Sequence, residues 1–283
     1  MTELRLEEVS YKYGIGTPFE KDALDSVSCS FTPGRITGII GHTGSGKSTL
    51  AQLLNGLNKP HSGRVLIDGR DIWEDKGSII NVRFRVGLVF QYPEYQLFEE
   101  TVYADIAFGP KNMRKSDAEI DALVKSAAEF AGVSEELLQK SPFELSGGQK
   151  RRVAIAGVMA MDPDIIVFDE PAAGLDPGGR EAIFKGIKDY QRKKGKTVII
   201  ISHSMEDMAK YADELVVLKD GRVLCSGSVA EVFGKSELIR SSGLGLPWVT
   251  SFMNKLSTLG VEVDCGVYTA EDAYQQIISR IKE

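Results

Sequence analysis

The 283-residue sequence contains few cysteines and no long apolar run. Cys29, Cys225 and Cys265 lie far apart and form no Cys-x-x-Cys pair, so neither a disulfide framework nor a zinc site is expected, and a reducing cytosol is favoured. The longest aliphatic run, Val198–Ile201, is far too short to span a bilayer. The first residues lack the basic start and apolar run of a signal peptide. Any role at a membrane is therefore expected to be peripheral.

The sequence also lacks an excess of basic charge. It carries 34 basic and 40 acidic residues, for a formal net charge of −6, so no global positive field points to nucleic acid. Hydrophobic residues make up 42% and charged residues 26%, which is ordinary for a soluble globular protein. The length allows one large domain or two modest ones. No nucleic-acid partner is expected.

Apolar runs alternate with helical patterns over most of the chain, which is typical of an α/β protein with a mainly parallel sheet. Consecutive branched apolar residues predict strands buried on both faces at Ile36–Ile40, Val86–Phe90, Ile165–Phe168 and Val198–Ile201. Helices are predicted at Lys47–Asn55, Arg151–Met161, Pro177–Lys193 and Met205–Tyr211.

A second, antiparallel sheet is predicted from the remaining apolar segments. Leu4–Tyr13 has the pattern of an edge strand, and Val65–Asp68 is a candidate neighbour. Leu215–Leu218 and Val223–Cys225 are also expected to join this sheet. Asp220-Gly221 stands between the last two runs and is a good hairpin signal.

Two further segments read mainly as helix. Residues 92–160 look like a helical insertion into the α/β core. Beyond about Ser228 the glycines and Pro247 break the chain, and two amphipathic helices follow. Their apolar stripes suit either core packing or a partner surface. We therefore predict a first domain at 1–227 and a C-terminal extension at 228–283 that serves in dimerisation.

The segment from Gly41 to Ser48 fits the phosphate-loop pattern G-x-x-x-x-G-K-[ST], between a predicted strand and a predicted helix. Glycines let backbone N–H groups surround phosphate oxygens, and the start of the helix adds positive potential. Lys47 is expected to reach the β- and γ-phosphates and Ser48 to ligate Mg²⁺. The predicted contacts to ATP from this loop are Gly41, Thr43, Gly44, Ser45, Gly46, Lys47, Ser48 and Thr49.

Two carboxylates end the predicted strand at Ile165–Phe168. In a parallel sheet, ligands sit beyond the carboxyl ends of the strands, where the phosphate loop also lies. Asp169 is expected to hold Mg²⁺, and Glu170 to polarise the water that attacks the γ-phosphate. Alone, the pair could equally be an acidic helix cap before Pro171. Together with the phosphate loop it predicts ATP hydrolysis.

The sequence Leu145-Ser146-Gly147-Gly148-Gln149 resembles the signature segment of the ABC ATPases. Ser146 is expected to cap a helix whose free N–H groups form a second anion site. The resemblance implies the ABC ATPase fold, in which two subunits pack head to tail. Residues 146–149 then bind the ATP that the partner subunit holds.

The remaining ABC elements follow in the expected order. By resemblance, Gln91 touches Mg²⁺ and the attacking water, Asp176 lies at the dimer interface near ATP, and His203 contacts the γ-phosphate. Tyr13 is similar to the aromatic residue that stacks on adenine, with Tyr11 as the second candidate. Each of these alone could be an ordinary surface or structural residue. The resemblance covers about residues 2–227.

The segment Phe90–Pro110 resembles the corresponding part of energy-coupling factor transporter ATPases. The resemblance implies a subunit on the cytoplasmic face of the cell membrane that drives uptake of vitamins or metal ions. Its implied partners are a transmembrane coupling subunit, a substrate-binding membrane subunit and a second ATPase, either a paralogue or another copy. Packing within the insertion is the alternative reading of the aromatic residues in this segment.

His42-Thr43 in the phosphate loop favours the second of the two ATPase paralogues of this family. Because ABC ATPases also act in other processes, a soluble ABC ATPase of translation or DNA maintenance remains the alternative. The short stretch between Lys47 and Leu145 leaves no room for the long coiled coils that repair proteins usually insert there, and the chain has one cassette.

Overall fold

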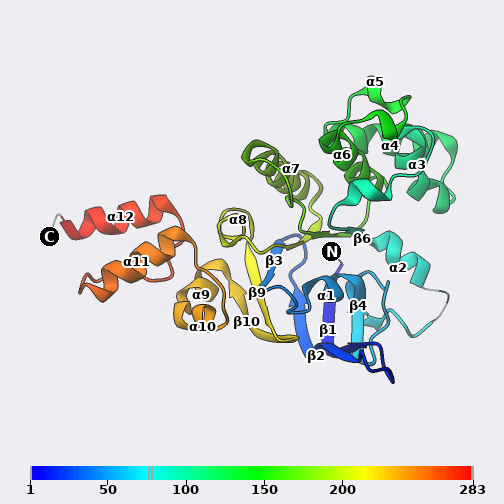
Figure 1. The fold of residues 1–283 in the computed structure, drawn as a ribbon. Helices are drawn as coiled ribbons and strands as arrows, with labels where there is room; N and C mark the ends of the chain where they lie inside the picture. The colour runs from blue at the N-terminus through cyan, green and yellow to red at the C-terminus, as the bar shows by residue number, and fades with distance from the viewer. Residues whose placement is uncertain (1, 76, 78, 282–283) are drawn as a thin grey trace.

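The main sheet has six strands in the order β10-β9-β3-β8-β7-β6. We describe it in a computed structural model that covers residues 2–75, 77 and 79–281 (Figure 1). Its strands are β3 Ile36–Gly41, β6 Val86–Val89, β7 Ile165–Asp169, β8 Thr197–Ile201, β9 Glu214–Lys219 and β10 Arg222–Ser228. All pairs are parallel except β9 with β10. Every residue of β3, β6, β7 and β8 is buried, which explains their continuous apolar runs and confirms the predicted α/β class.

The second sheet is antiparallel, as predicted, but its membership differs from the prediction. It contains β2 Lys21–Phe31, β1 Leu4–Tyr13, β4 Ser62–Ile67 and β5 Arg70–Asp71, in the order β2-β1-β4-β5. The predicted edge strand β1 therefore lies inside the sheet. β2 was not predicted, because a bulge at Ser26, with φ of 50°, interrupts the alternation of apolar and polar residues.

β9 and β10 were wrongly placed in the second sheet. β9 pairs in parallel with β3, and Leu215–Leu218 are buried at every position. Continuous burial is typical of a strand covered on both faces. In a sheet with one solvated face, buried apolar residues alternate with exposed polar residues along each strand. The hairpin between β9 and β10 is confirmed, with Asp220 and Gly221 at φ of 49° and 77°.

Helices cover both faces of the main sheet. α1 Lys47–Leu54 packs with the second sheet on one face, while α7 Pro177–Lys194 and α8 Met205–Tyr211 pack on the other. These three agree with the prediction within a residue. The short helices α2 Ile79–Arg85, α9 Val229–Gly234 and α10 Ser236–Ser241 were not predicted.

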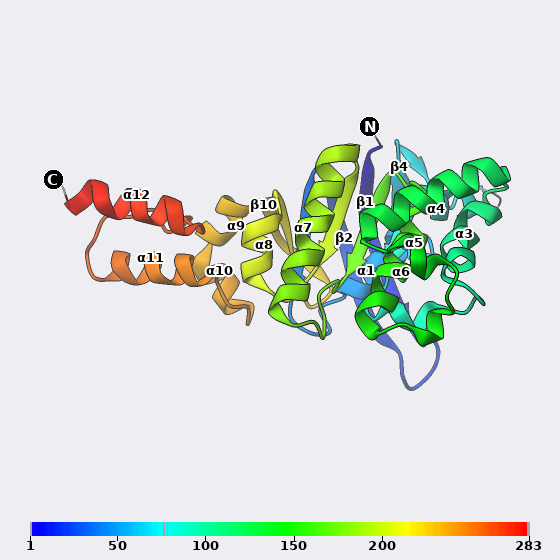
Figure 2. The same ribbon diagram turned by 90° about the horizontal axis from the view of Figure 1, so that it is seen from above.

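The predicted helical insertion forms a separate lobe beside the sheet, visible in Figures 1 and 2. It has its own apolar core, built from α3, α4 and α6. Its elements are η1 Pro93–Gln96, α3 Val102–Asn112, α4 Asp117–Ala131, α5 Glu135–Leu138, η2 Pro142–Glu144 and α6 Gly147–Met159. α6 begins four residues before the helix predicted at Arg151, since Ser146 and Gln149 form a capping box at its start.

The two amphipathic helices near the C-terminus are α11 Trp248–Thr258 and α12 Ala270–Ile281. They pack on each other through a small apolar cluster that includes Val249 and Met253. Figure 2 shows this pair projecting from the end of the molecule opposite the helical insertion. None of the helices in the described part of the chain combines the length and apolar character needed to cross a membrane.

Replacing Arg85 with methionine is expected to weaken the fold in a pH-dependent way. Arg85 binds Asp68 at 2.6 Å and Asp164 at 2.9 Å. Partial burial raises the pKa of each carboxyl, but the hydrogen bonds and charge of Arg85 outweigh it, so both pKa values lie below the ordinary value. Stability from this cluster is therefore present above the unfolded pKa of about 4 and is lost as the pH falls below it.

For these half-exposed pairs we expect the variant to lose about 1 kcal/mol of unfolding free energy at pH 7. At about pH 3, below the unfolded pKa, the difference should be much smaller. Urea unfolding of both proteins at the two pH values measures it. An equal loss at both would show that packing of the arginine stem, and not its charge, is what matters.

Candidate nucleotide-binding site

The phosphate loop lies between the end of β3 and the start of α1, as predicted. Gly46 has φ of 101°, and a Cβ there would lie 2.5 Å from the carbonyl oxygen of Ala23, so only glycine fits. Lys47 Nζ donates to the carbonyl oxygens of Gly41 at 2.7 Å and His42 at 2.9 Å. Burial lowers the pKa of Lys47, partly offset by the charges of Glu170 and Asp169. The ammonium group is thus held against the loop in which a phosphate would lie.

A cavity of about 530 Å³ opens at this loop, in the range typical of small-molecule sites. It brings together residues from β1, β2, the phosphate loop and the ends of β6, β7 and β8. They are Tyr13, Lys21, Ala23, Thr43, Gly44, Gly46, Lys47, Ser48, Thr49, Gln91, Asp169, Glu170 and His203. Of the predicted loop residues, Gly41 and Ser45 do not line the cavity and are buried behind it.

Tyr13, and not Tyr11, reaches this cavity. The Tyr13 hydroxyl lies 3.1 Å from Thr49 Oγ1, which ties β1 to the first turn of α1. Tyr11 packs edge-on against Tyr13 and against the apolar core. The half-exposed ring of Tyr13 is available for stacking on a flat base.

Asp169 ends β7 beside the phosphate loop. Its Oδ1 atom is buried and has no hydrogen-bond partner among the described residues. Burial raises the pKa of Asp169, a hydrogen bond with Ser48 lowers it, and the charge of Glu170 raises it again. An unpartnered carboxylate oxygen next to a hydroxyl fits the oxygen ligands that Mg²⁺ prefers, so these two residues can hold the ion.

Glu170 and His203 meet at the carboxyl ends of the neighbouring strands β7 and β8. His203 Nδ1 lies 2.9 Å from both carboxylate oxygens of Glu170, while the Glu170 N–H donates to the carbonyl oxygen of Ile201 at 3.0 Å. Glu170 has φ of 51°, an unfavourable conformation for a non-glycine residue that is common at functional sites. The pair has the geometry of a base held by a hydrogen-bonded partner.

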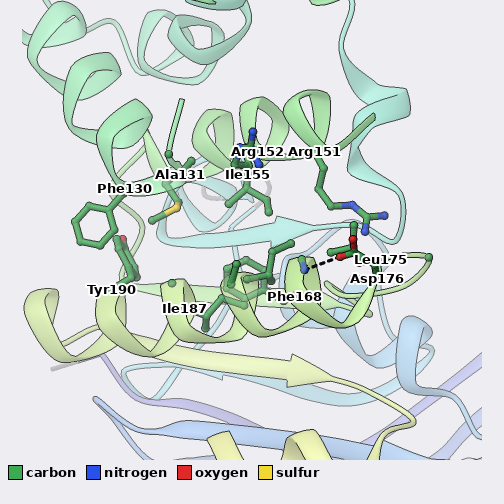
Figure 3. A pocket seen from close by; sticks show the side chains of 18 residues that line it. Phe130, Ala131, Arg151, Arg152, Ile155, Phe168, Leu175, Asp176, Ile187 and Tyr190 are labelled. Carbon is green, nitrogen blue, oxygen red and sulfur yellow. Dashed lines mark hydrogen bonds between the residues drawn. The ribbon is translucent and has the colours of Figure 1, made fainter. Parts of the chain in front are cut away.

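Besides Gly41 and Ser45, five predicted nucleotide contacts lie outside this cavity, at residues 146–149 and 176. Ser146 accepts a hydrogen bond from the Gln149 N–H at 3.3 Å and caps α6, as predicted from the sequence. Asp176 caps α7 by accepting from the Gly179 N–H at 2.7 Å. Asp176 and Gly148 line a different cavity of about 600 Å³ between α4, α6 and α7 (Figure 3). Residues 146–149 and 176 therefore do not meet the phosphate loop of their own chain.

The chain is similar in sequence to a well-defined group of proteins. The family described as "ABC transporter" matches residues 24–173. The energy-coupling factor transporter ATP-binding protein EcfA2 of Clostridium acetobutylicum is 49% identical over 276 residues, covering 97% of this chain and 96% of the relative. EcfA2 of Enterococcus faecalis is 44% identical and covers 99% of this chain and 98% of the relative.

The chain belongs to the energy-coupling factor transporter ATPases. This confirms the resemblance found in the sequence, including the choice of the second paralogue. The names of these relatives do not favour the alternative of a soluble ABC ATPase in translation or DNA maintenance.

Solved structures agree with this family. CbiO1 from Clostridium perfringens, described as part of the ABC transporter complex cbiONQ, superposes with a TM-score of 0.74 at 40% identity. The match covers 90% of this chain and 97% of that one. The ATP-binding cassette MJ0796, solved as a dimer bound to ADP and Pi, gives 0.71 at 29% identity over 80% of this chain and 98% of that one. Nucleotide binding is thus a property of this energy-coupling factor ATPase.

Two groups of residues escaped the sequence analysis, one in the nucleotide cavity and one beside the second cavity. Lys21 and Ala23 line the cavity from β2, the strand whose bulge hid it. Arg151 pairs with Glu94, 57 residues away in sequence, and the pairing depends on how the insertion folds. Nothing local in the sequence distinguishes Arg151 from its charged neighbours Lys150 and Arg152, so only its burial in the folded structure identifies it.

Replacing Asp169 with asparagine is expected to stabilise the unliganded fold of this ATPase and to lower its ATP hydrolysis. The pKa of Asp169 is raised in the fold, so the ionised side chain destabilises the protein at pH 7, and this penalty disappears as the pH falls below the unfolded pKa of about 4. Thermal unfolding without nucleotide or magnesium should show a higher melting temperature at pH 7 and little change at about pH 3. A lower melting temperature at pH 7 would contradict the cost assigned to this charge.

Proposed function

We propose that the chain binds ATP·Mg²⁺ and hydrolyses it as a subunit of an energy-coupling factor transporter, driving uptake of vitamins or metal ions. The observation that carries this proposal is the division of the predicted ATP contacts into two sets on one chain. One set surrounds Lys47 in the phosphate-loop cavity. The other set, at residues 146–149 and 176, lies outside that cavity. Such a chain needs a second ATPase subunit to complete each site.

The residues that line the phosphate-loop cavity around Lys47 account for ATP binding and hydrolysis. Lys47 and the phosphate loop bind the β- and γ-phosphates, and Tyr13 stacks on the adenine. Ser48, Asp169 and Gln91 would hold Mg²⁺, which would neutralise charge on the phosphates. Glu170 accepts the proton of the attacking water, and His203 orients Glu170 and contacts the γ-phosphate.

The second set completes the site of the neighbouring subunit. Gly147 and Gly148 have no positive φ, and a Cβ at either would meet nothing within 4 Å, so the chain itself has no need of glycine there. A bare backbone at the exposed start of α6 instead allows close approach by a phosphate of another molecule. With Ser146, Gln149 and Asp176, these residues would close over ATP held by a paralogue or a second copy.

The membrane-facing side is assigned to the segment between Gln91 and α3. Tyr95 and Phe98 are exposed there beside acidic residues, which suits an amphipathic basic helix of a transmembrane coupling subunit. A separate substrate-binding membrane subunit would select the cargo. The chain would then lie at the cytoplasmic face of the cell membrane as a peripheral subunit.

We divide the chain into an ATPase domain at 1–227 and a C-terminal extension at 228–283. The extension holds its own apolar cluster and exposes Trp248, Phe252 and Tyr274. Exposed aromatic residues on a projecting helical pair support a second contact between the ATPase subunits.

Replacing Gly148 with aspartate tests the composite site. The single chain should keep its melting temperature and its affinity for ATP, because position 148 lies outside its own nucleotide cavity. Hydrolysis by the assembled ATPase should fall about a hundredfold, since a carboxylate would face the partner's phosphates. Phosphate release and ATP binding are measured on the same preparation. Near-native hydrolysis would contradict the proposed head-to-tail site.

A further inference from the structure

Arg151 lies in the second turn of α6 and is almost completely buried, with 3% of its side chain exposed. Its guanidinium binds the Glu94 carboxylate through two contacts, at 3.1 and 3.2 Å. It also donates to the carbonyl oxygen of Ala173 at 2.7 Å and lies 5.8 Å from the centre of the Tyr92 ring. The planar guanidinium of Arg151 is thus held by the Glu94 carboxylate, the Ala173 carbonyl oxygen and the face of the Tyr92 ring.

These partners belong to different segments of the chain. Glu94 is in η1, three residues after Gln91, in the segment that continues from that loop. Ala173 lies in the turn after Glu170, and its N–H donates to the Glu170 carbonyl oxygen at 3.1 Å. Arg151 itself is on the helix that begins at the signature residues. Figure 3 shows Arg151 extending from α6 toward the loop that carries Leu175 and Asp176.

Stability alone does not account well for this arrangement. A buried ion pair brings little net stability over apolar side chains of similar volume, because both charges lose their hydration. The other ion pairs recorded in the insertion, Lys115–Glu119 and Lys125–Asp121, are exposed. What a bidentate buried pair does provide is one fixed relative position for the two segments that it joins.

We propose that the Arg151–Glu94 pair makes the Gln91 loop and the signature segment one moving unit, with Arg151 as a positioning residue for both ATP sites of a dimer. The loop responds to the nucleotide of its own chain, while the signature segment binds the nucleotide of the partner. The pair therefore links the two sites. This linkage rests on the proposed function, but the rigidity of the unit does not.

Spin labels test the rigidity directly on the full chain. Tyr95 and Phe143 are 84% and 67% exposed, on η1 and just before the signature segment, and can be replaced by labelled cysteines after Cys29, Cys225 and Cys265 are changed to serine. We expect one narrow distance distribution that stays the same when ATP is added. Glu94→Gln and Arg151→Met should each broaden it. A distribution in these variants that matches the unmutated pair would overturn the proposal.

The matched control makes the same acid-to-amide change on an exposed pair of the same lobe. Asp121→Asn removes the carboxylate that binds Lys125 at 2.8 Å and should leave the distribution narrow. The double variant Glu94→Gln, Arg151→Met leaves no buried charge unpaired, so it keeps the test valid if a single variant fails to fold. If the two residues act as one unit, the double variant is no broader than either single variant.

ATP hydrolysis tests the linkage in the assembled ATPase. Glu94→Gln should lower turnover about tenfold and bring the Hill coefficient for ATP down to about 1, with the KM for ATP within about twofold. A purely structural defect would lower the melting temperature without this change in cooperativity. Absence of hydrolysis in the native protein would reject the proposed function and leave the distance result standing. Native hydrolysis with unchanged cooperativity in the variants would overturn the linkage.

Discussion

Replacing Glu170 with glutamine is expected to lower ATP hydrolysis about a thousandfold while ATP still binds. Glutamine has nearly the same volume and can still hydrogen-bond His203, but it cannot accept the proton of the attacking water. Lys47 and the phosphate loop do not depend on this carboxylate for their contacts. Phosphate release and binding of a fluorescent ATP analogue, measured side by side, separate the two effects.

The control for this prediction is the same change at an exposed acid. Glu181 on α7 pairs with Lys210 at the surface, so Glu181→Gln should leave both hydrolysis and binding unchanged. Hydrolysis near the native rate in Glu170→Gln would remove Glu170 from the role of general base. Loss of ATP binding in that variant would instead show that the carboxylate supports the fold of the site.

Replacing Lys47 with methionine is expected to weaken ATP binding about a hundredfold, and hydrolysis falls with it. A charge-assisted hydrogen bond contributes about 1.5–3 kcal/mol, and Lys47 is the predicted donor to both terminal phosphates. Methionine retains most of the buried stem, so packing is preserved. Because burial lowers the pKa of Lys47, removing its charge also relieves a desolvation cost, which limits any loss of stability.

Calorimetric titration with ATP measures this loss. Lys185→Met, at an exposed position of α7, is the matched control and should bind as the native chain does. An affinity within about threefold of the native value in Lys47→Met would mean that the backbone of the loop, and not the ammonium group, supplies most of the binding energy.

The parts of the fold that could be predicted are those in which one local pattern decides the structure. Strands buried on both faces are continuous apolar runs, which explains why β3, β7 and β8 were found. Leu215–Leu218 is a continuous apolar run of the same kind and lies in the main sheet, although its antiparallel hairpin with β10 resembles the pairing of the second sheet. β2 could not be predicted by alternation, because its bulge shifts the side chains between faces.

At the site, too, the features set by local sequence could be predicted, and those set by tertiary packing could not. The phosphate loop and the Ser146 cap depend on residues within one turn of each other, and both lie where the sequence predicts them. Contacts between distant segments, such as Arg151 with Glu94 and Tyr13 with Thr49, depend on tertiary packing and could not be read from spacing. The division of the ATP contacts between two chains was predicted only through the resemblance to ABC ATPases.

Affinity purification of the full chain from gently solubilised native membranes, with the co-purifying chains identified by mass spectrometry, tests the transporter assignment. If the chain energises an energy-coupling factor transporter, the recovered chains are a second ATPase subunit, one shared transmembrane protein and one or more small substrate-binding membrane proteins. Recovery of ribosomes or DNA-bound factors with no membrane partner would contradict it.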